Sequence, residues 1–443
     1  MNDTIAALAS GRIPAGVAVI RISGPHAFRI VDQITDVPCS SQQSSTARLT
    51  TLWSILDRRV VDQALRIVFK NPRSFTGEDV VELHVHGGLV VIDEVLELLY
   101  SAGARPANPG EFSERAFLNG KLDLTQAEAI ADIIAAPTRS ARELASMQLG
   151  GQLTNIVTEI EQQIQRARVL LEASIDFPED VGDVDVIALV AILQAAVCDL
   201  ERLQRTARRG RLVRQGASVV LLGAPNVGKS SLLNVLAGKD RAIVSPIAGT
   251  TRDTIDVQID IAGIPITLTD TAGLRESTDA IEMIGIDRTR QSIGHADIVL
   301  ALESDDTPPI DLPELQTAAC VLKVHTKSDI SMGVNESPDK HYVSAKTHQG
   351  IDDLIQGIVH QLLDDGNPTN SNERIAVNAR HSALILLATD ALNRVITASK
   401  AGITPDLLAV DLHDAAFHLA NISGRNVIDA MHQEIFSRFC IGK

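Results

Sequence analysis

The sequence predicts a multidomain protein that combines α/β and all-α parts. Three observations predict this class. Short apolar strands alternate with helical stretches between residues 216 and 365, which is typical of a wound α/β domain. Apolar residues recur every three or four positions on both sides of that segment, which indicates amphipathic helices. Residues 1–118 mix strand-like and helix-like stretches, so a further α/β domain is expected there.

Composition narrows the classes of function. The chain has 443 residues, 45% hydrophobic and 22% charged, as in ordinary globular proteins with a packed core. Its 56 acidic and 40 basic residues give a net charge of −16, so any contact with nucleic acid has to be local or supplied by a partner. Its 9 Phe, 2 Tyr and 1 Trp are too few for the base-stacking platform of a single-strand binder.

The cysteines and the apolar runs indicate the cellular compartment of the protein. Cys39, Cys198, Cys320 and Cys440 lie far apart, which excludes a CxxC zinc site and a disulfide framework and is consistent with a reducing compartment. No apolar run approaches the roughly 18 residues of a membrane span, and the N-terminus lacks the pattern of a signal peptide. We therefore expect a cytoplasmic protein that does not contact the membrane.

The first predicted domain covers residues 1–118. The apolar runs 17–22 (VAVIRI) and 64–69 (ALRIVF) read as strands, and residues 90–99 read as a helix. These stretches are too short and too mixed for an all-helical segment, so they predict a small α/β domain.

A helical domain is predicted in two separate parts, residues 119–215 and 366–443. In the first part, one apolar stripe indicates a long helix: Leu149, Leu153, Ile156, Ile160, Ile164, Ala167 and Leu171. In the second part, four residues mark one side of a helix: Leu384, Leu387, Leu392 and Val395. Residues 364–372 (DDGNPTNSN) read as a linker, so the simplest arrangement inserts the α/β domain of residues 216–365 into the helical domain.

One cluster of positive charge has two interpretations. The arginines stand close together without an acidic residue among them: Arg202, Arg205, Arg208, Arg209, Arg211 and Arg214. They are either an RNA-binding surface, since a guanidinium group can donate two hydrogen bonds to a phosphate, or a solvated helix face that leads into the next domain. A run of this kind is more often the solvated face.

The strongest chemical signal is a phosphate-binding loop. Residues 223–230 (GAPNVGKS) match GxxxxGK[ST], follow an apolar strand and open a helical pattern, which is the context that this motif requires. Its glycines let backbone N–H groups surround the phosphates at a helix N-terminus. Lys229 would reach the β- and γ-phosphates and act in catalysis, and Ser230 would bind Mg²⁺.

Four further segments follow in the order of a GTPase. Residues 249–253 (GTTRD) would bring Thr251 to Mg²⁺, and residues 270–273 (DTAG) would place a carboxylate near the metal and Gly273 near the γ-phosphate. Residues 326–329 (TKSD) would read guanine through Asp329, and residues 344–346 (SAK) would cover the base. Together these segments resemble the translation-factor-type GTPases, which usually carry Asn at the position of Thr326. Because Thr326 offers a hydroxyl in place of that amide, we expect a somewhat altered affinity for guanine.

The predicted GTP-binding residues come from these five segments and from residues next to two of them. They are Asn226, Val227, Gly228, Lys229, Ser230, Ser231, Ser245, Pro246, Ile247, Ala248, Gly249, Thr250, Thr251, Asp270, Thr271, Ala272, Gly273, Thr326, Lys327, Asp329, Ser344, Ala345 and Lys346.

Hydrolysis would lack the water-orienting glutamine of Ras-like proteins and would use a cation where an arginine finger would otherwise act. Leu274 follows the DTAG segment and cannot orient water. Resemblance to the potassium-dependent GTPases implies that four residues hold K⁺: Asn226, Ser245, Ile247 and Thr250. The same resemblance implies that Glu282 positions the attacking water, although the sequence alone favours an exposed helix residue at that position.

The segments outside the GTPase core carry a more specific resemblance. They are IFSRFCIGK (435–443), VIRISG (19–24), SFTGEDVVEL (74–83), HGG (86–88) and NPGEFSERAFLNGKLDL (108–124). With the inserted GTPase, they resemble the MnmE (TrmE) family of tRNA modification GTPases over nearly the full length. The resemblance implies an N-terminal α/β domain for dimerisation and folate binding, a discontinuous helical domain and an inserted Ras-like P-loop GTPase domain.

The resemblance also implies a reaction and partners. The family adds a carboxymethylaminomethyl or aminomethyl group to C5 of the wobble uridine of certain tRNAs. It uses 5-formyltetrahydrofolate or another tetrahydrofolate derivative and acts with a flavin-dependent partner, MnmG. A homodimer is expected, with FAD on the partner only and tRNA bound mainly through that partner.

The implied folate contacts are Arg21, Glu82, Lys121 and Lys443. Cationic groups suit the glutamyl carboxylates of a folate, and a carboxylate accepts from pterin N–H groups. Without the resemblance, Arg21 would more simply be a residue at the rim of a sheet. Cys440 is either a nucleophile in one-carbon chemistry, if Lys443 lowers the pKa of its thiol, or a small apolar residue near the C-terminus.

Two other hypotheses are weighed against this one. A ribosome-assembly GTPase predicts a basic RNA-binding segment after residue 365, where this chain has an apolar helical segment instead. A stand-alone folate enzyme predicts a catalytic constellation within residues 1–120, where no convincing nucleophile–base pair is found. The acidity of the chain favours the tRNA-modifying complex, because a partner can supply the tRNA-binding surface.

Overall fold

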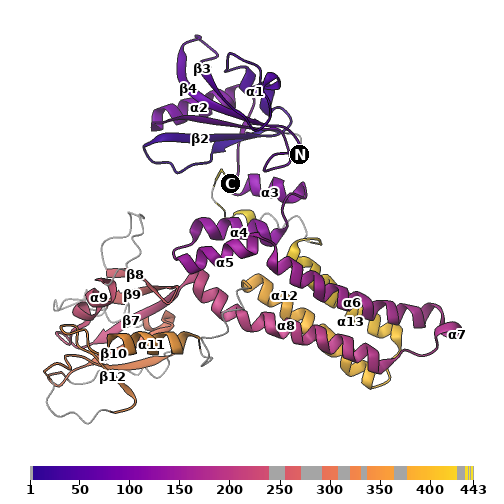
Figure 1. The fold of residues 1–443 in the computed structure, drawn as a ribbon, viewed down its shortest axis with the longest axis vertical. Coiled ribbons are helices and arrows are strands. Elements are labelled where there is room, and N and C mark those ends of the chain that lie inside the picture. Colours follow the sequence, from indigo (N-terminus) through magenta and orange to yellow (C-terminus); the bar gives the residue numbers. More distant parts are fainter. Residues whose placement is uncertain are drawn as a thin grey trace, which may run out of the picture. The chain divides into compact units, whose positions relative to one another are not determined.

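The computed structural model describes residues 3–238, 255–270, 292–307, 320–330, 337–363, 377–426, 435–437, 439, 441 and 442. The chain divides into two compact units, Met1–Ala131 with Leu419–Lys443, and Asp132–His418. Each unit contains a six-stranded sheet (Figure 1), so the sequence was right to predict α/β structure both at the N-terminus and in the middle of the chain.

The first unit is built on a sheet with the strand order β3-β4-β5-β2-β1-β6. Neighbouring strands are antiparallel except β1 and β6, which run parallel. The strands are β1 (Ile5–Leu8), β2 (Ala15–Ser23), β3 (Ala47–Trp53), β4 (Val60–Phe69), β5 (Val80–Gly87) and β6 (Arg105–Pro106). The predicted strands at 17–22 and 64–69 are confirmed within β2 and β4, which extend further.

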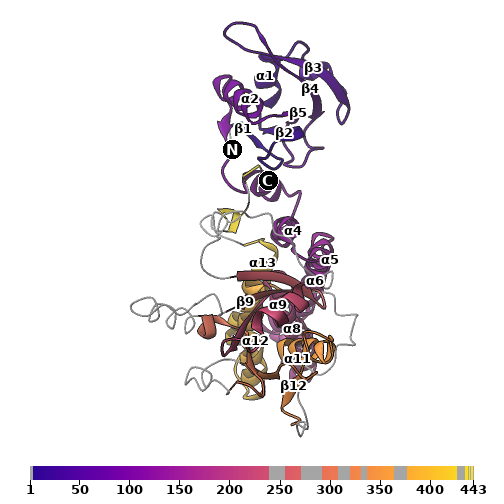
Figure 2. The same cartoon turned by 90° about the vertical axis from the view of Figure 1, so that its left-hand side faces the viewer.

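Helices cover one face of this sheet. They include α1 (Ala27–Asp32), a short 3-10 helix (Cys39–Ser41) and α2 (Leu89–Ser101), and the predicted helix at 90–99 is confirmed within α2. Figure 2 shows α1 and α2 beside the strands. Val81, Leu83 and Val85 of β5 are buried in the core shared with these helices. Since side chains alternate along a strand, Glu82 and His84 lie on the opposite face.

The end of the chain packs within the first unit. Phe436 is 1% exposed and shares an apolar cluster with Leu124 and the nearby Phe117. Ile441 forms an isolated antiparallel bridge with Pro109, in the loop before α3 (Glu111–Leu118). A Cβ atom added at Gly442 would lie 2.0 Å from the Leu8 carbonyl oxygen, so only glycine fits this close approach. The tail is therefore held beside the end of β1.

Long helices form one part of the second unit, with α4 (Leu124–Ala135) leading into it. They are α5 (Arg139–Leu149), α6 (Gln152–Asp176), the short α7 (Pro178–Val181), α8 (Val186–Gln215), α12 (Ala379–Lys400) and α13 (Pro405–Ser423), the last of which extends into the first unit. The two predicted helical parts thus belong to one bundle, since α8 packs against both α6 and α12.

Two details of the predicted helical stripes are wrong. The first stripe is not on one helix, because α5 ends at Leu149 and α6 begins only after Gly151, whose φ of 80° breaks the helix. Val157 rather than Ile156 is buried within that stripe. On α12, Leu387 is 48% exposed and the buried side instead carries Ile385 with its helical neighbours.

The second sheet has the order β12-β11-β10-β7-β9-β8, and all neighbours run parallel except β8 with β9. Its strands are β7 (Ala217–Gly223), β8 (Ile255–Ile261), β9 (Ile264–Asp270), β10 (Ile298–Glu303), β11 (Val321–His325) and β12 (Lys340–Tyr342), with helices α9 (Lys229–Gly238) and α11 (Ile351–Leu363). Parallel strands end at one edge of a sheet, where ligands of wound α/β folds bind. At that edge β7 leads into the phosphate-binding loop, Asp270 ends β9, and β11 leads into the predicted base segment.

Candidate functional sites

The phosphate-binding loop joins β7 to α9. Asn226 and Gly228 have φ angles of 63° and 106°, so the chain turns through the left-handed region twice within the motif. A Cβ atom at Gly223 would lie 2.7 Å from a Val227 methyl group, which explains why the loop starts with glycine. The loop therefore brings the N-terminus of α9, with its unpaired N–H groups, to the edge of the sheet.

Lys229 is folded back onto this loop. Its side chain is 6% exposed, and its Nζ donates to the carbonyl oxygens of Gly223 at 2.6 Å and Ala224 at 2.9 Å. Burial lowers the pKa of the Lys229 ammonium, and the Asp270 carboxylate opposes part of this shift. Neutral carbonyls are weak partners for a buried cation, so an anion at the loop would improve the environment of Lys229.

Oxygen atoms suited to Mg²⁺ meet beside the loop. Ser230 Oγ donates to Asp270 Oδ2 at 3.0 Å, which joins the first turn of α9 to the end of β9. A hydroxyl and a carboxylate are hard oxygen ligands of the kind that Mg²⁺ prefers. The donor set therefore fits the metal that accompanies a bound nucleoside triphosphate.

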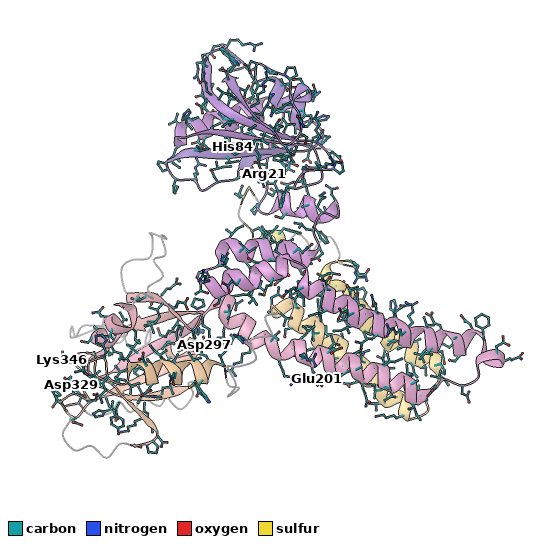
Figure 3. The ribbon with its side chains drawn as sticks, in the orientation of Figure 1. Arg21, His84, Glu201, Asp297, Asp329 and Lys346 are labelled. Atoms are coloured by element: carbon teal, nitrogen blue, oxygen red, sulfur yellow. The ribbon has the colours of Figure 1, made fainter. Side chains whose placement is uncertain are left out.

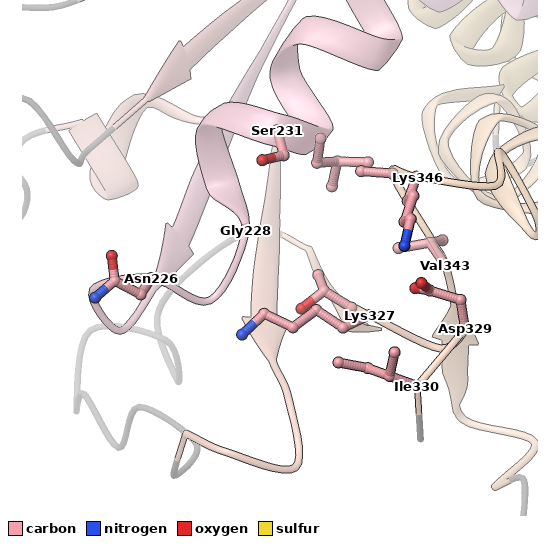
Figure 4. A pocket seen from close by; sticks show the side chains of 11 residues that line it. Asn226, Gly228, Ser231, Lys327, Asp329, Ile330, Val343 and Lys346 are labelled. Atoms are coloured by element: carbon pink, nitrogen blue, oxygen red, sulfur yellow. The ribbon is translucent and has the colours of Figure 1, made fainter. Parts of the chain in front are cut away.

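A cavity of 450 Å³ opens next to the phosphate-binding loop. Its lining residues are Asn226, Gly228, Ser231, Leu232, Thr326, Lys327, Asp329, Ile330, Val343, Ala345 and Lys346. Figure 4 shows Asn226 at one end and Asp329 with Lys346 at the other. This volume is typical of small-ligand sites. The phosphate end and the base end predicted from separate motifs thus belong to one cavity.

The carboxylate that would read the base is held in place. Asp329 Oδ1 accepts a hydrogen bond of 2.7 Å from Ser344 Oγ, and Ser344 is fully buried. The Ser328 N–H donates to the Val343 carbonyl at 3.2 Å. The loops after β11 and β12 therefore support each other, and the second Asp329 oxygen remains available for a ligand.

Thr326 links the base end to the phosphate end. Its Oγ1 donates to the Val227 carbonyl at 2.5 Å and lies 3.1 Å from the Glu303 carbonyl. The side chain is 5% exposed, so water does not compete for these contacts. The Thr326 hydroxyl, at a position where related GTPases usually carry Asn, thus connects the base segment with the phosphate-binding loop and the end of β10.

The structure brings together thirteen of the residues predicted for the nucleotide. They are Asn226, Val227, Gly228, Lys229, Ser230, Ser231, Asp270, Thr326, Lys327, Asp329, Ser344, Ala345 and Lys346. Other predicted residues lie outside the described residues: Ser245, Pro246, Ile247, Ala248, Gly249, Thr250, Thr251, Thr271, Ala272, Gly273 and Glu282. The sequence reasoning missed Leu232, Ile330 and Val343, apolar lining residues whose only signal is that they adjoin the motifs.

A second polar cluster lies on the open face of the first sheet. Arg21 of β2 stands opposite Glu82 of β5, and its Nε and Nη2 atoms lie 2.9 Å and 2.8 Å from Glu82 Oε1. The guanidinium carbon is 5.4 Å and 5.7 Å from the ring centres of Phe75 and Phe112, neither of which the sequence analysis singled out. His84, two residues along β5, has its Nε2 3.6 Å from Glu82 Oε2 (Figure 3).

The other predicted folate residues are only partly described. Lys121 is exposed, and its Nζ donates to the Pro72 carbonyl at 3.0 Å, beside the loop that carries Phe75. Lys443 and Cys440 lie outside the described residues. Their neighbour Gly442 contacts Leu8, which pairs with Ile20, the residue before Arg21. Gly442 therefore lies near the strands that carry the cluster.

Two features are absent from the described residues. None of the helices there is both long and apolar enough to span a membrane. The same part of the chain contains no group of three His, Cys, Asp or Glu side chains arranged to hold a metal ion.

Comparisons with known proteins cover the whole chain. The family model "GTP-binding protein TrmE N-terminus" matches residues 4–121, and "MnmE helical domain" matches residues 124–440. A tRNA modification GTPase MnmE from Roseiflexus sp. (strain RS-1) is 40% identical and covers 100% of this chain and 99% of its own. Another from Natranaerobius thermophilus is 38% identical and covers 100% of both chains.

A solved structure matches only part of the chain. The G domain of the T. maritima FeoB iron transporter is 26% identical, covers 33% of this chain and 98% of its own, and has a TM-score of 0.27. A TM-score this low supports no conclusion about the fold.

Proposed function

Because the chain belongs to the MnmE (TrmE) family of tRNA modification GTPases, we propose that its GTP hydrolysis drives the addition of a carboxymethylaminomethyl or aminomethyl group to C5 of the wobble uridine of certain tRNAs. The protein is a GTP hydrolase that acts in tRNA modification. The observation that carries the finer proposal is the full-length match, which includes both the nucleotide cavity and the cluster around Arg21.

In the proposed hydrolysis, Lys229 exchanges the carbonyls of its own loop for phosphate oxygens. This exchange is favourable because the ammonium gains a charged partner that the loop does not give it. Ser230 and Thr251 would hold Mg²⁺, which neutralises phosphate charge when it is bound. Gly273 would contact the γ-phosphate. Asp329 would accept two N–H groups of guanine, which makes the site selective for GTP.

Potassium dependence is a further part of the proposal. Asn226 offers an amide oxygen at the phosphate end of the cavity, and Ser245, Ile247 and Thr250 would complete a K⁺ site. A cation there stabilises the charge that develops in the transition state. Glu282 would orient the attacking water, in the place of the glutamine that this chain lacks.

We assign a tetrahydrofolate derivative, such as 5-formyltetrahydrofolate, to the first unit. The chemistry of the cluster supports this assignment, because Arg21 lies on two aromatic rings and is held by Glu82. Arg21 would hold Glu82 where its carboxylate accepts from the pterin N–H groups, and Lys121 and Lys443 would bind the glutamyl carboxylates.

The proposed assembly is a homodimer that works with a flavin-dependent, MnmG-like partner, which would hold the FAD. An apolar patch on the open face of the first sheet supports the homodimer. It contains Val17, Leu49 and Leu65, which are 59%, 67% and 46% exposed. Strand register places them on the face that carries His84 and His86. Burying such a patch against a second copy would be favourable.

Mass spectrometry of tRNA nucleosides tests the proposed reaction. Cells that lack this protein would be compared with cells complemented by the wild type or by Lys229→Ala. We expect the C5-modified wobble uridines to disappear, to return with the wild type and to stay absent with the variant. Unchanged nucleosides in the deletion strain would refute the wobble-uridine proposal and would favour a role in ribosome assembly.

A further inference from the structure

Neither site explains the arginines at the C-terminal end of α8. Residues 202–214 include Arg202, Arg205, Arg208, Arg209, Arg211 and Arg214 and no acidic residue, in a chain with a net charge of −16. The other side of this helix is occupied by buried residues, Leu203, Thr206 and Gly210. The helix therefore presents an apolar side to the bundle and a basic side to solvent.

Three of the six arginines have roles within the fold. Arg214 is 14% exposed and forms an ion pair with Asp132. Arg211 lies 3.8 Å from Asp297, and Arg208 has contacts of its own. These three are set aside, and Arg202, Arg205 and Arg209 remain.

The remaining three are exposed and have at most one long polar contact each among the described residues. Arg202 is 62% exposed and lies 3.7 Å from Asp199 on its own helix. Among the described residues, Arg205 donates one hydrogen bond, to the carbonyl of Glu201 at 3.4 Å. Arg209 is exposed and contacts no acid or polar group within the described part of the chain. Glu201, labelled on α8 in Figure 3, is the exposed acid one residue before Arg202.

Two other exposed helix arginines of this unit are paired more closely. Arg168 and Arg394 lie 2.6 Å and 2.7 Å from carboxylates, whereas Arg202 lies 3.7 Å from Asp199. An ordinary solvated helix face mixes both signs of charge in this way. Residues 202–214 of α8 contain no acidic residue over about three and a half helical turns, although the chain as a whole has an excess of acidic residues.

We propose that Arg202, Arg205 and Arg209 form a surface that binds the phosphate backbone of the tRNA substrate. They are spaced by three and four residues, so they share one side of α8 and span about 10.5 Å along it. Guanidinium groups bind phosphate oxygens in pairs, which suits successive phosphates of an RNA strand. The row contains no aromatic residue for base stacking, so the contact reads backbone shape and charge rather than sequence.

This surface adds a contact by the chain itself to the tRNA contacts expected from the partner. It depends on tRNA being the substrate, and not on which uridine is modified or which folate is used. Because the rest of the chain is acidic, the contact is local, and its strength falls steeply with salt.

Binding of the full-length chain to purified tRNA tests the proposal. The test variant replaces Arg202, Arg205 and Arg209 by Gln, which keeps helix propensity. The matched control replaces Arg142, Arg168 and Arg394 by Gln, with the same change in charge. We expect the test variant to bind tRNA at least tenfold more weakly at about 50 mM salt, and its slope of log K against log salt to be shallower by about 2 to 3. The control should bind like the wild type.

Three results would overturn the proposal. They are wild-type chain that does not bind tRNA, equal losses in test and control variants, and a test variant that keeps tRNA binding but loses binding to vesicles with anionic lipid. In the reconstituted complex, the test variant should raise the KM for tRNA and leave the rate of GTP hydrolysis without tRNA unchanged. A folding defect would appear as a lower rate of that hydrolysis and a lower unfolding midpoint. Failure of the wobble-uridine proposal alone would leave the binding result intact.

Discussion

Replacing Thr326 by Val should weaken nucleotide binding, because Thr326 joins the base loop to the phosphate-binding loop. Its Oγ1 donates to the Val227 carbonyl at 2.5 Å from a position that is 5% exposed. Val has nearly the same shape but no hydroxyl, so that carbonyl loses a donor where water cannot replace it. An unmade buried hydrogen bond costs about 1–3 kcal/mol. If the whole of this cost falls on nucleotide binding, the dissociation constant rises about 5- to 150-fold.

A fluorescent GDP analogue would measure this effect by titration of the wild type, Thr326→Val and Thr326→Ser. We expect Val to weaken binding about tenfold and Ser, which keeps the hydroxyl, to stay within about threefold. Unfolding midpoints, with and without nucleotide, separate a loss of affinity from a loss of stability. If Val binds like the wild type and has the same midpoint, the hydroxyl does not organise the site and this reasoning is wrong.

Three further predictions concern other parts of the molecule. Ser344→Ala removes the donor to Asp329 Oδ1 at 2.7 Å, so the preference for GTP over ATP should fall about tenfold in competition binding, whereas Ser344→Thr should keep it. Arg21→Gln should weaken binding of 5-formyltetrahydrofolate at least tenfold in calorimetry without changing GTP hydrolysis; unchanged folate binding would remove Arg21 from the proposed site. Burial and the like charge of Glu111 raise the pKa of the Glu114 carboxyl above 4.5. The folded chain therefore loses stability as the pH rises from 4.5 through that raised pKa, because the carboxyl ionises. Glu114→Gln should therefore raise the unfolding midpoint at pH 7 and have little effect below pH 4.5, and an equal gain at both pH values would contradict this.

The nucleotide site was predictable because most of its signals are local. The phosphate-binding loop depends on glycines within eight residues, and the strands before it and after it are apolar runs. The order of parallel strands then brings residues 229, 270 and 329 to one edge of the sheet. What the sequence did not predict is the bond from Thr326 to Val227, because it joins residues 99 positions apart through a side chain of ordinary type.

The helical parts show what apolar periodicity does not predict. Leu149 and Leu153 keep the helical spacing across Gly150 and Gly151, so the periodicity did not reveal that one helix ends and another begins. Leu387 fits a stripe by spacing, yet the face of α12 that is buried depends on where α8 packs. The cluster around Arg21 likewise depends on register, which sets Glu82 opposite it across two strands that are 61 residues apart.

GTP hydrolysis at the cavity beside Asp329 is the step that we propose drives tRNA modification. Asp329→Asn tests it most directly, because the amide reverses one hydrogen-bonding position and should prefer xanthine over guanine. The chain would be combined with its flavin-dependent partner, folate and unmodified tRNA, and the modified uridine would be measured with GTP or with xanthosine triphosphate. We predict that the variant modifies tRNA with xanthosine triphosphate and fails with GTP, while the wild type shows the reverse. Equal modification by the variant with either nucleotide, or with none, would contradict the claim.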